Sequence, residues 1–368
     1  VLRLKVKSGG YNDWLVSRDG SLYLGECYTP ARLSHLPSLS VPSSALKRTQ
    51  NDQGFQPLKE IAQVAPLLEL ARREYPAFYR DWKIVSYDLS NEFYKLFLDP
   101  TMTYSAAFYG ENCNLSLEAA QKKKNQQAIS LCGNMNKNFS VLEIGCGWGG
   151  FARQLLEETS AKYFGITLSE KQYEYINETF YPHSDNDRCV FEILDYRNVV
   201  GKFDLIVSIE MFEAVGVRYW SIFFKKLYEN LKPNGCIGLQ TITIDEKFFQ
   251  TYKKFPDFIQ TYIFPGGMLP SIAAINEVMS NEGLYIDKKN MFGLDYAETL
   301  KRWRFSFQDS LSEIKSQGFN DTFLRMWNYY LSYCEGGFRS RNIDVGQFLI
   351  KKNERDTRSF VSLISYLF

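Results

Sequence analysis

A glycine-rich run at residues 141–150, with the sequence VLEIGCGWGG, is the part of the chain best suited to holding a ligand. The apolar residues 141–144 predict a buried strand, and the glycines after them predict a turn into a helix. Glycine lets the backbone approach a ligand without a Cβ in the way. The N–H groups at the start of the helix behind the loop are free to bind it. So many glycines at one junction cost backbone entropy that a purely structural turn does not require, so we expect a ligand here.

Two classes of ligand compete for this loop. A dinucleotide fold needs GxGxxG and an acidic residue at the end of the second strand, but this chain has GCGWGG and its second strand ends at Thr167. An acidic residue before GxGxG, here Glu143, is instead typical of S-adenosylmethionine-dependent methyltransferases. In those enzymes the loop packs against the carboxypropyl part of the cofactor. We therefore predict S-adenosylmethionine as cofactor, with Glu143, Gly145 and Gly147 at its site.

Further polar residues follow later strands of the same predicted sheet. Asp195 and Tyr196 come after the third strand, where they are expected to flank the adenine. The fourth strand delivers Glu210 and Glu213 to the carboxyl edge of the sheet. Ligands of open α/β sheets bind at that edge.

The elements that must position these residues alternate along the chain. Strands are predicted at 140–144, 162–166, 189–194, 204–209 and 236–244, with helices at 149–159, 169–180 and 219–231. This order predicts an α/β fold with a doubly wound parallel sheet, of the Rossmann-like kind found in class I methyltransferases. After a proline- and glycine-bearing insertion come helices at 271–282, 296–316 and 320–334 and strands near 284–291 and 343–350.

The chain of 368 residues, 45% of them hydrophobic, is long enough for one large domain and a small one. Residues 1–66 predict a small N-terminal domain and linker, which is expected to be incomplete because the chain begins at Val1. Residues 67–368 predict the catalytic domain. Within it we expect a helical cap at 67–132 and a lid insertion at 245–270.

Composition excludes several classes of function. The 43 basic and 42 acidic residues give a net charge of +1, which argues against a nucleic-acid binder that relies on bulk charge. The two histidines, His35 and His183, lie in polar stretches and argue against histidine-based metal sites and Ser-His-Asp catalysis. Seven cysteines without a CxxC pair predict reduced thiols and a cytoplasmic location. No apolar run of membrane-spanning length occurs.

From about residue 84 to the last predicted strand, the chain resembles the cyclopropane-fatty-acyl-phospholipid synthases and mycolic acid cyclopropane synthases. The matching segments are 87–89 (YDL), 91–94 (NEFY), 97–105 (FLDPTMTYS), the 141–150 loop, 165–169 (GITLS), 211–213 (MFE), 262–271 (YIFPGGMLPS), 292–293 (FG), 295–296 (DY) and 337–339 (GFR). They occur in order over most of the chain, which makes the resemblance far more specific than the glycine loop alone.

The resemblance implies an enzyme that transfers a methyl group from S-adenosylmethionine to the double bond of an unsaturated acyl chain. A bicarbonate ion, held by a Cys–Glu–His–Ile–Tyr set, then removes a proton and the cyclopropane ring closes. The implied cofactor contacts are Tyr104, Ser105, Gly145, Gly147, Thr167, Gln172 and Tyr196.

Two positions of the bicarbonate set depart from the family. The chain keeps Glu213, Ile242 and Tyr296, but has Ala106 in place of cysteine and Gln240 in place of histidine. The amide of Gln240 can donate a hydrogen bond but cannot carry a positive charge, and Ala106 offers its backbone N–H. Bicarbonate could persist with weaker binding, or Glu213 or Tyr296 could act on the cation without it. A displaced base would release a different proton and give a methyl- or methylene-branched product.

Three functions therefore stand at this stage. The first is cyclopropanation of acyl chains in phospholipid, the second is synthesis of a methyl-branched fatty acid such as a furan fatty acid precursor, and the third is a cofactor-binding pseudoenzyme that regulates a partner. We expect peripheral association with a membrane surface and no nucleic-acid partner. Lys122–Lys124 are expected on a solvated face, and the aromatic run 360–368 suits a homodimer contact, a docked helix or a membrane contact.

Overall fold

The computed structural model describes residues 89–111, 114–130, 135–180 and 188–353. The expected N-terminal domain at 1–66, residues 67–88 of the expected helical cap, both histidines and the run 360–368 lie outside this part of the chain.

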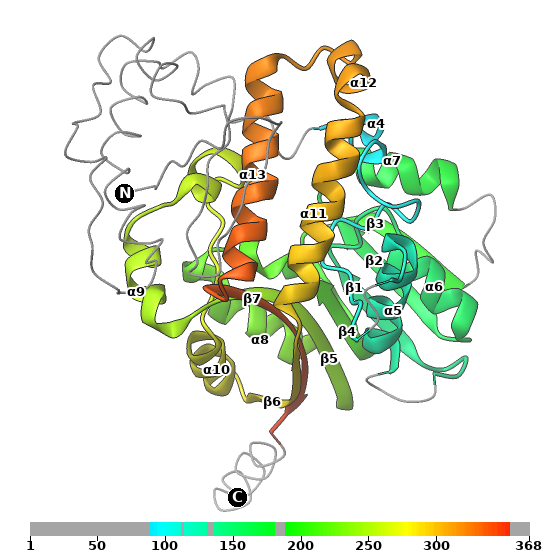
Figure 1. Cartoon of the computed structure of the whole chain (residues 1–368). Helices are drawn as coiled ribbons and strands as arrows, with labels where there is room; N and C mark the ends of the chain where they lie inside the picture. The colour runs from blue at the N-terminus through cyan, green and yellow to red at the C-terminus, as the bar shows by residue number, and fades with distance from the viewer. Residues whose placement is uncertain (1–88, 112–113, 131–134, 181–187, 354–368) are drawn as a thin grey trace, which may run out of the picture.

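A seven-stranded sheet with the order β3-β2-β1-β4-β5-β7-β6 forms the centre of the fold (Figure 1). Its strands are β1 (Ser140–Ile144), β2 (Lys162–Thr167), β3 (Cys189–Ile193), β4 (Phe203–Ile209), β5 (Leu231–Ile244), β6 (Leu284–Met291) and β7 (Ile343–Lys352). All seven predicted strands are present, and β1 to β5 pair in parallel as predicted.

The prediction of a wholly parallel sheet is wrong at one edge, because β7 runs antiparallel to both β5 and β6. The reason lies in the two long helices between β6 and β7, α11 (Gly293–Asp309) and α13 (Asp321–Arg339). They form an antiparallel pair that returns the chain to the end of the sheet from which it left. There the backbone N–H of Phe292 donates to the carbonyl of Val345 at 2.8 Å.

Helices cover both faces of the sheet, as a doubly wound fold requires. One face packs against α8 (Trp220–Asn230) and α10 (Ile272–Asn281), and the other against α5 (Leu117–Ser130), α6 (Gly150–Glu158) and α7 (Glu170–Thr179). Side chains alternate between these cores along β1: Val141 faces α6, and Leu142 faces α8. This alternation is the period of two expected of a strand buried on both faces.

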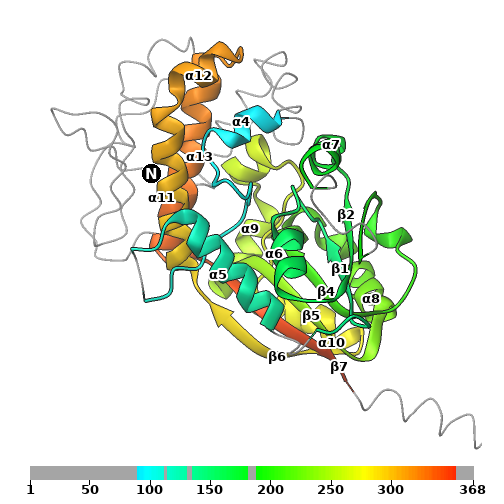
Figure 2. The same ribbon diagram turned by 90° about the vertical axis from the view of Figure 1, so that its right-hand side faces the viewer.

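A third, aromatic layer lies beyond the sheet, where α11 and α13 stand side by side (Figures 1 and 2). The short α4 (Asn91–Lys95) adds Phe93, which is wholly buried and meets the ring of Trp327 at 5.2 Å between centroids. The single helix predicted at 296–316 begins earlier and breaks at Ser310, where α12 (Leu311–Ser316) starts. Edge-to-face rings thus hold together a helical layer drawn from both ends of the described chain.

The 245–270 insertion has more regular structure than expected. It contains α9 (Glu246–Lys254), which begins where the Asp245 side chain accepts a hydrogen bond from the Lys247 backbone, and a π-helical turn, η8 (Ile259–Ile263). Phe248 and Phe249 of α9 are buried against the α8 side of the sheet. Amphipathic spacing, rather than proline or glycine content, therefore decides the structure of this segment.

Cysteine chemistry also departs from expectation. Cys146, Cys189 and Cys334 are free thiols, but Cys236 on β5 is disulfide-bonded, so the prediction of reduced thiols is wrong at that position. The cytoplasmic location loses this support and stays an expectation. Across the described residues, no helix combines the length and apolarity needed to cross a membrane.

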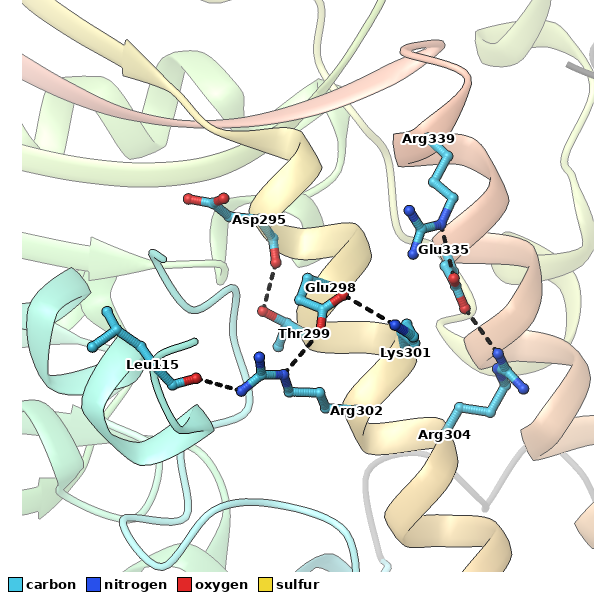
Figure 3. Close-up of polar contacts among 9 residues, drawn as sticks. All are labelled: Leu115, Asp295, Glu298, Thr299, Lys301, Arg302, Arg304, Glu335 and Arg339. Atoms are coloured by element: carbon cyan, nitrogen blue, oxygen red, sulfur yellow. Dashed lines mark hydrogen bonds and ion pairs between the residues drawn. The ribbon is translucent and has the colours of Figure 1, made fainter. Parts of the chain in front are cut away.

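A buried ion pair joins the two long helices (Figure 3). Glu335 of α13 binds Arg304 of α11 at 3.3 Å and Arg339 one turn along its own helix at 2.8 Å. Arg304 and Glu335 are only 5% and 9% exposed, so neither charge could be satisfied by water alone. Their separation therefore leaves a charge uncompensated in the protein interior.

We predict that Glu335→Leu lowers the free energy of unfolding by about 3–5 kcal/mol, because Arg304 is left buried without its partner. The double variant Arg304→Met with Glu335→Leu should regain much of this loss, because it removes both charges. Urea denaturation followed by circular dichroism measures both values. A double variant no more stable than Glu335→Leu would contradict the prediction.

Candidate active site

The glycine loop after β1 adopts the open backbone that a bound cofactor requires. Gly145 and Gly147 have positive φ of 83° and 55°, and the N–H groups of Gly145 and Cys146 donate to the carbonyl of Ile166 on β2. A Cβ added to Gly147 would meet no atom within 4 Å, whereas one on Gly145 would lie 3.0 Å from Cγ of Met211. The loop thus leaves room at Gly147, and the residues present fit S-adenosylmethionine.

Residues at the end of β2 lie next to this loop because Ile144 and Ile166 are paired in register. The hydroxyl of Thr167 donates to the side-chain oxygen of Gln172 at 2.7 Å. The side chain of Ser169 caps α7 by accepting from the Gln172 backbone. The structure therefore brings Thr167 and Gln172 together beside the loop, as the resemblance implies for cofactor contacts.

Asp195 and Tyr196 follow β3 in the short helix η5 (Tyr196–Asn198). The Asp195 carboxylate pairs with Arg197 at 2.5 Å, and this hydrogen-bonded guanidinium holds the pKa of Asp195 below its usual range. The ring of Tyr196 packs against Phe223 at 5.3 Å between centroids. Both residues are half-buried, and their contact with adenine stays a prediction.

The other predicted cofactor contacts are tied to buried partners. The hydroxyl of Tyr104 pairs with that of Tyr330 at 2.7 Å, and the Ser105 hydroxyl accepts from the ammonium of Lys124 at 2.8 Å. Glu143 accepts from the hydroxyl of Tyr163, and burial raises the pKa of Glu143 to about 7. These hydrogen bonds with buried partners hold the side chains of Tyr104, Ser105 and Glu143 in place.

Lys124 corrects the expectation of a solvated lysine face. Lys122 is exposed and pairs with Glu118, but Lys124 is 1% exposed, and burial lowers its pKa to about 8. The two lysines differ because residues two positions apart lie about 200° apart around a helix, so that Lys124 faces the interior when Lys122 faces solvent. The Lys122–Lys124 run therefore places the cation of Lys124 beneath the candidate active site, instead of presenting all three lysines on the surface.

Glu210, at the carboxyl end of β4, is the centre of the site. One carboxylate oxygen accepts from the backbone N–H of Ala106 at 2.8 Å and from the Gln240 amide at 2.7 Å, and the other accepts from the Tyr296 hydroxyl at 2.6 Å. Burial holds the pKa of Tyr296 well above its usual range, so its hydroxyl stays a donor. Three of the five positions that the resemblance assigns to the bicarbonate set thus converge on one carboxylate.

Strand pairing explains this convergence. Ile209 lies opposite Gln240 in the β4–β5 pair, and the Glu210 backbone N–H donates to the Gln240 carbonyl at 2.8 Å. Gln347 on β7 lies opposite Gln240 on its other side and donates to its side-chain oxygen at 3.0 Å, which leaves the Gln240 NH₂ group to face Glu210. Glu210 itself has a φ of +50°, which turns the chain sharply as it leaves the strand.

Glu213, in the next turn η6 (Phe212–Ala214), completes the set with Ile242. One oxygen of Glu213 accepts from the Ile242 backbone at 2.5 Å, while Oε2 is buried without a hydrogen-bond partner in the described structure. Burial and the nearby Glu210 raise the pKa of Glu213 to about 8. Glu210 is also shifted upward by burial, but its three donors oppose the shift in pKa. We therefore expect Glu213 to hold a proton at neutral pH and Glu210 to carry the charge.

Bicarbonate does not fit this arrangement. The N–H of Ala106, the Gln240 amide and the Tyr296 hydroxyl already donate to Glu210, so a second anion would lack these donors and would face a carboxylate. The sequence pattern placed Glu210 at the ligand-binding edge but did not give it a role. The available signal was an acidic residue directly at the end of the fourth strand, beside the strand that carries Gln240.

The chain is similar in sequence and fold to several known proteins. A family model described as mycolic acid cyclopropane synthetase matches residues 79–348. The chain is 35% identical to tuberculostearic acid methyltransferase UfaA1 of Mycobacterium tuberculosis, over 77% of this chain and 69% of that protein. It is 34% identical to the cyclopropane-fatty-acyl-phospholipid synthase of Escherichia coli, over 72% and 66%. The structure of mycolic acid cyclopropane synthase CmaA1 with SAH and CTAB superposes with a TM-score of 0.68 at 32% identity, over 73% of this chain and 96% of that one.

We predict that Gly147→Val removes S-adenosylmethionine binding at a cost in stability of only about 1–2 kcal/mol, the cost of a left-handed backbone without glycine. Gly145→Val should lose more stability, because its side chain would also collide with Met211. Titration calorimetry and thermal unfolding separate the two effects. A folded Gly147→Val variant with unchanged affinity would disprove the cofactor site.

A second prediction concerns pH. Folded Glu213 keeps its proton up to about pH 8, whereas the unfolded chain releases it near the ordinary value of 4.5. Stability from this group is therefore complete below pH 4.5 and is lost as pH rises towards 8. Glu213→Gln should make the fall in the free energy of unfolding between pH 5 and 8 shallower by up to about 1.4 kcal/mol per pH unit. Glu143 contributes in the same direction, so a slope remains. Equal slopes in the variant and the wild type would contradict the shift.

Proposed function

Since this chain belongs to the mycolic acid cyclopropane synthetase family, we propose that it transfers a methylene unit to the double bond of an unsaturated acyl chain in a phospholipid, giving a cyclopropane fatty acid. The chain is an S-adenosylmethionine-dependent methyltransferase with the class I fold, and its relatives act on unsaturated lipids. The observation that carries the proposal is the set of three hydrogen bonds that Glu210 accepts at the carboxyl edge of the sheet, the edge that also carries the cofactor loop.

The site residues supply orientation and proton transfer. When bound, S-adenosylmethionine supplies an electrophilic methyl group: the π electrons of the alkene form the new carbon–carbon bond, the carbon–sulfur bond breaks towards sulfur, and a cation remains on the neighbouring carbon. Thr167 and Gln172 would hold the polar part of the cofactor, and Gly147 would let it approach the strand end. Tyr296 and Gln240 position the acceptor of the proton, and the Ile242 backbone holds Glu213.

The aromatic layer suits both the substrate and the cation. The ring of Tyr104 packs against the rings of Tyr94 and Trp303, and its centroid lies 5.2 Å from that of Tyr94 and 5.3 Å from that of Trp303. Tyr296 packs on Phe338 at 4.5 Å. Aromatic faces bind acyl chains through their apolar area and stabilise a nearby positive charge through their π electrons.

A second product class has a specific observation in its favour. Gln240 cannot shuttle a proton as histidine does, and a relative with 35% identity is named tuberculostearic acid methyltransferase. Loss of a proton from a neighbouring carbon would leave a methyl- or methylene-branched chain. The intact Glu213, Tyr104 and Gln172 speak against a regulatory pseudoenzyme.

Labelled lipids test the function and the membrane partner together. Purified protein with methyl-labelled S-adenosylmethionine is incubated with vesicles of an unsaturated anionic phospholipid, and with the free fatty acid as control. We expect label in esterified acyl chains, a cyclopropane as main product by mass spectrometry, and co-sedimentation that weakens with salt. Label only in the free acid would exclude phospholipid, and a branched product alone would exclude the ring.

A further inference from the structure

We propose that the Glu210 carboxylate is itself the base of the reaction and takes the place that a bound bicarbonate ion holds in the family. This inference rests on the proposed function for its chemistry, but the replacement of the ion can be measured without any lipid.

The Glu210 carboxylate has the shape and the hydrogen-bond partners that a bound bicarbonate ion would need. Bicarbonate and a glutamate side chain both present two oxygens on one planar carbon. Here the two oxygens of Glu210 accept from Ala106, Gln240 and Tyr296, the groups that stand at three of the family's anion-binding positions. This explains why Ala106 and Gln240 replace the family's cysteine and histidine. An anion that is covalently part of the chain needs neither a cysteine side chain nor an imidazole to retain it.

The charge balance favours Glu210 over Glu213. The groups that face Glu210 are three neutral donors, the Glu213 carboxyl and, through space, the buried cation of Lys124. Glu213 has one carboxylate oxygen buried without a hydrogen-bond partner among the described residues, and burial and the neighbouring Glu210 raise its pKa to about 8, so a proton binds there first. The pair resembles other sites in which two neighbouring carboxyl groups share one charge.

The step balances without another reactant. After methyl transfer, a C–H bond of the transferred methyl group breaks, its electron pair forms the third side of the ring with the cationic carbon, and the proton goes to Glu210. The same carboxylate could take a proton from a neighbouring carbon, where the electron pair would form a double bond. In either case the cation is discharged and Glu210 becomes neutral, then returns its proton to solvent.

The first test compares Glu210→Gln with Glu213→Gln as the matched control. Both variants keep a planar polar side chain but remove the acid. We expect Glu210→Gln to lose on the order of 10²–10⁴-fold in turnover with unchanged affinity for S-adenosylmethionine, and Glu213→Gln to lose less. A larger loss in Glu213→Gln would assign the base to Glu213 and overturn the proposal.

The second test asks whether the side chain replaces the ion. The φ of +50° at Glu210 suits glycine, so Glu210→Gly should fold while leaving three donors without an acceptor. Titration with ¹³C-labelled bicarbonate, followed by NMR, should show binding to Glu210→Gly and none to the wild type. Formate or bicarbonate should also restore turnover to this variant but leave the wild type unaffected.

The two readouts separate the hypotheses. Binding of bicarbonate by Glu210→Gly alone supports the replacement even if the acyl substrate is misassigned. Binding of bicarbonate by the wild type, or stimulation of its turnover by bicarbonate, would overturn the proposal while leaving the methyltransferase function intact.

Discussion

The hydrogen bonds that converge on Glu210 tie together segments that are far apart in the sequence. Their donors are a loop residue at 106, a strand residue at 240 and a helix residue at 296. A buried carboxylate must have such partners, because desolvation of an unpaired charge costs several kcal/mol. The requirement therefore fixes the position of α11 and of the loop that carries Ala106 relative to the sheet. The same bonds that satisfy a buried charge also shape the space in which the chemistry occurs.

The electrostatics of the site follow from a few unequal neighbours. Lys124 lies beneath the site as a buried cation, Glu143 and Glu213 have raised pKa values, and Glu210 has the largest share of donors. In this arrangement Glu210 carries the negative charge, whereas Glu143 and Glu213 bind a proton more readily. A positive intermediate would then meet a single localised negative charge, while aromatic rings surround its other sides. Removal of a proton from such an intermediate depends mainly on which carboxyl group carries the charge. The number of carboxyl groups present matters less.

Much of the fold could be predicted because its signals are local. Strand and helix periodicity located all seven strands, and the glycine loop with Thr167 and Gln172 indicated the cofactor end of the site. The antiparallel β7 could not be predicted from local pattern, since its direction depends on how the α11–α13 pair returns the chain. The hydrogen bonds that converge on Glu210 were missed for the same reason: the partners of Glu210 come from three segments, and a residue-by-residue comparison with a family considers only the positions where the family has functional residues. The burial of Lys124 was missed because a run of like charges usually lies on the surface.

The place of β7 in the sheet has a consequence for how the protein matures. It is the last strand in the described chain, yet it is inserted between β5 and β6, and its Gln347 orients the Gln240 amide. A nascent chain that has emerged only as far as α13 contains the whole glycine loop and both site glutamates but lacks the strand that aligns them. Its sheet would also present β5 as an unpaired edge, the kind of surface to which other chains add. The catalytic centre is thus completed by a late, long-range pairing. Such contacts form slowly in folding, so this protein should acquire cofactor affinity before it acquires activity during its synthesis.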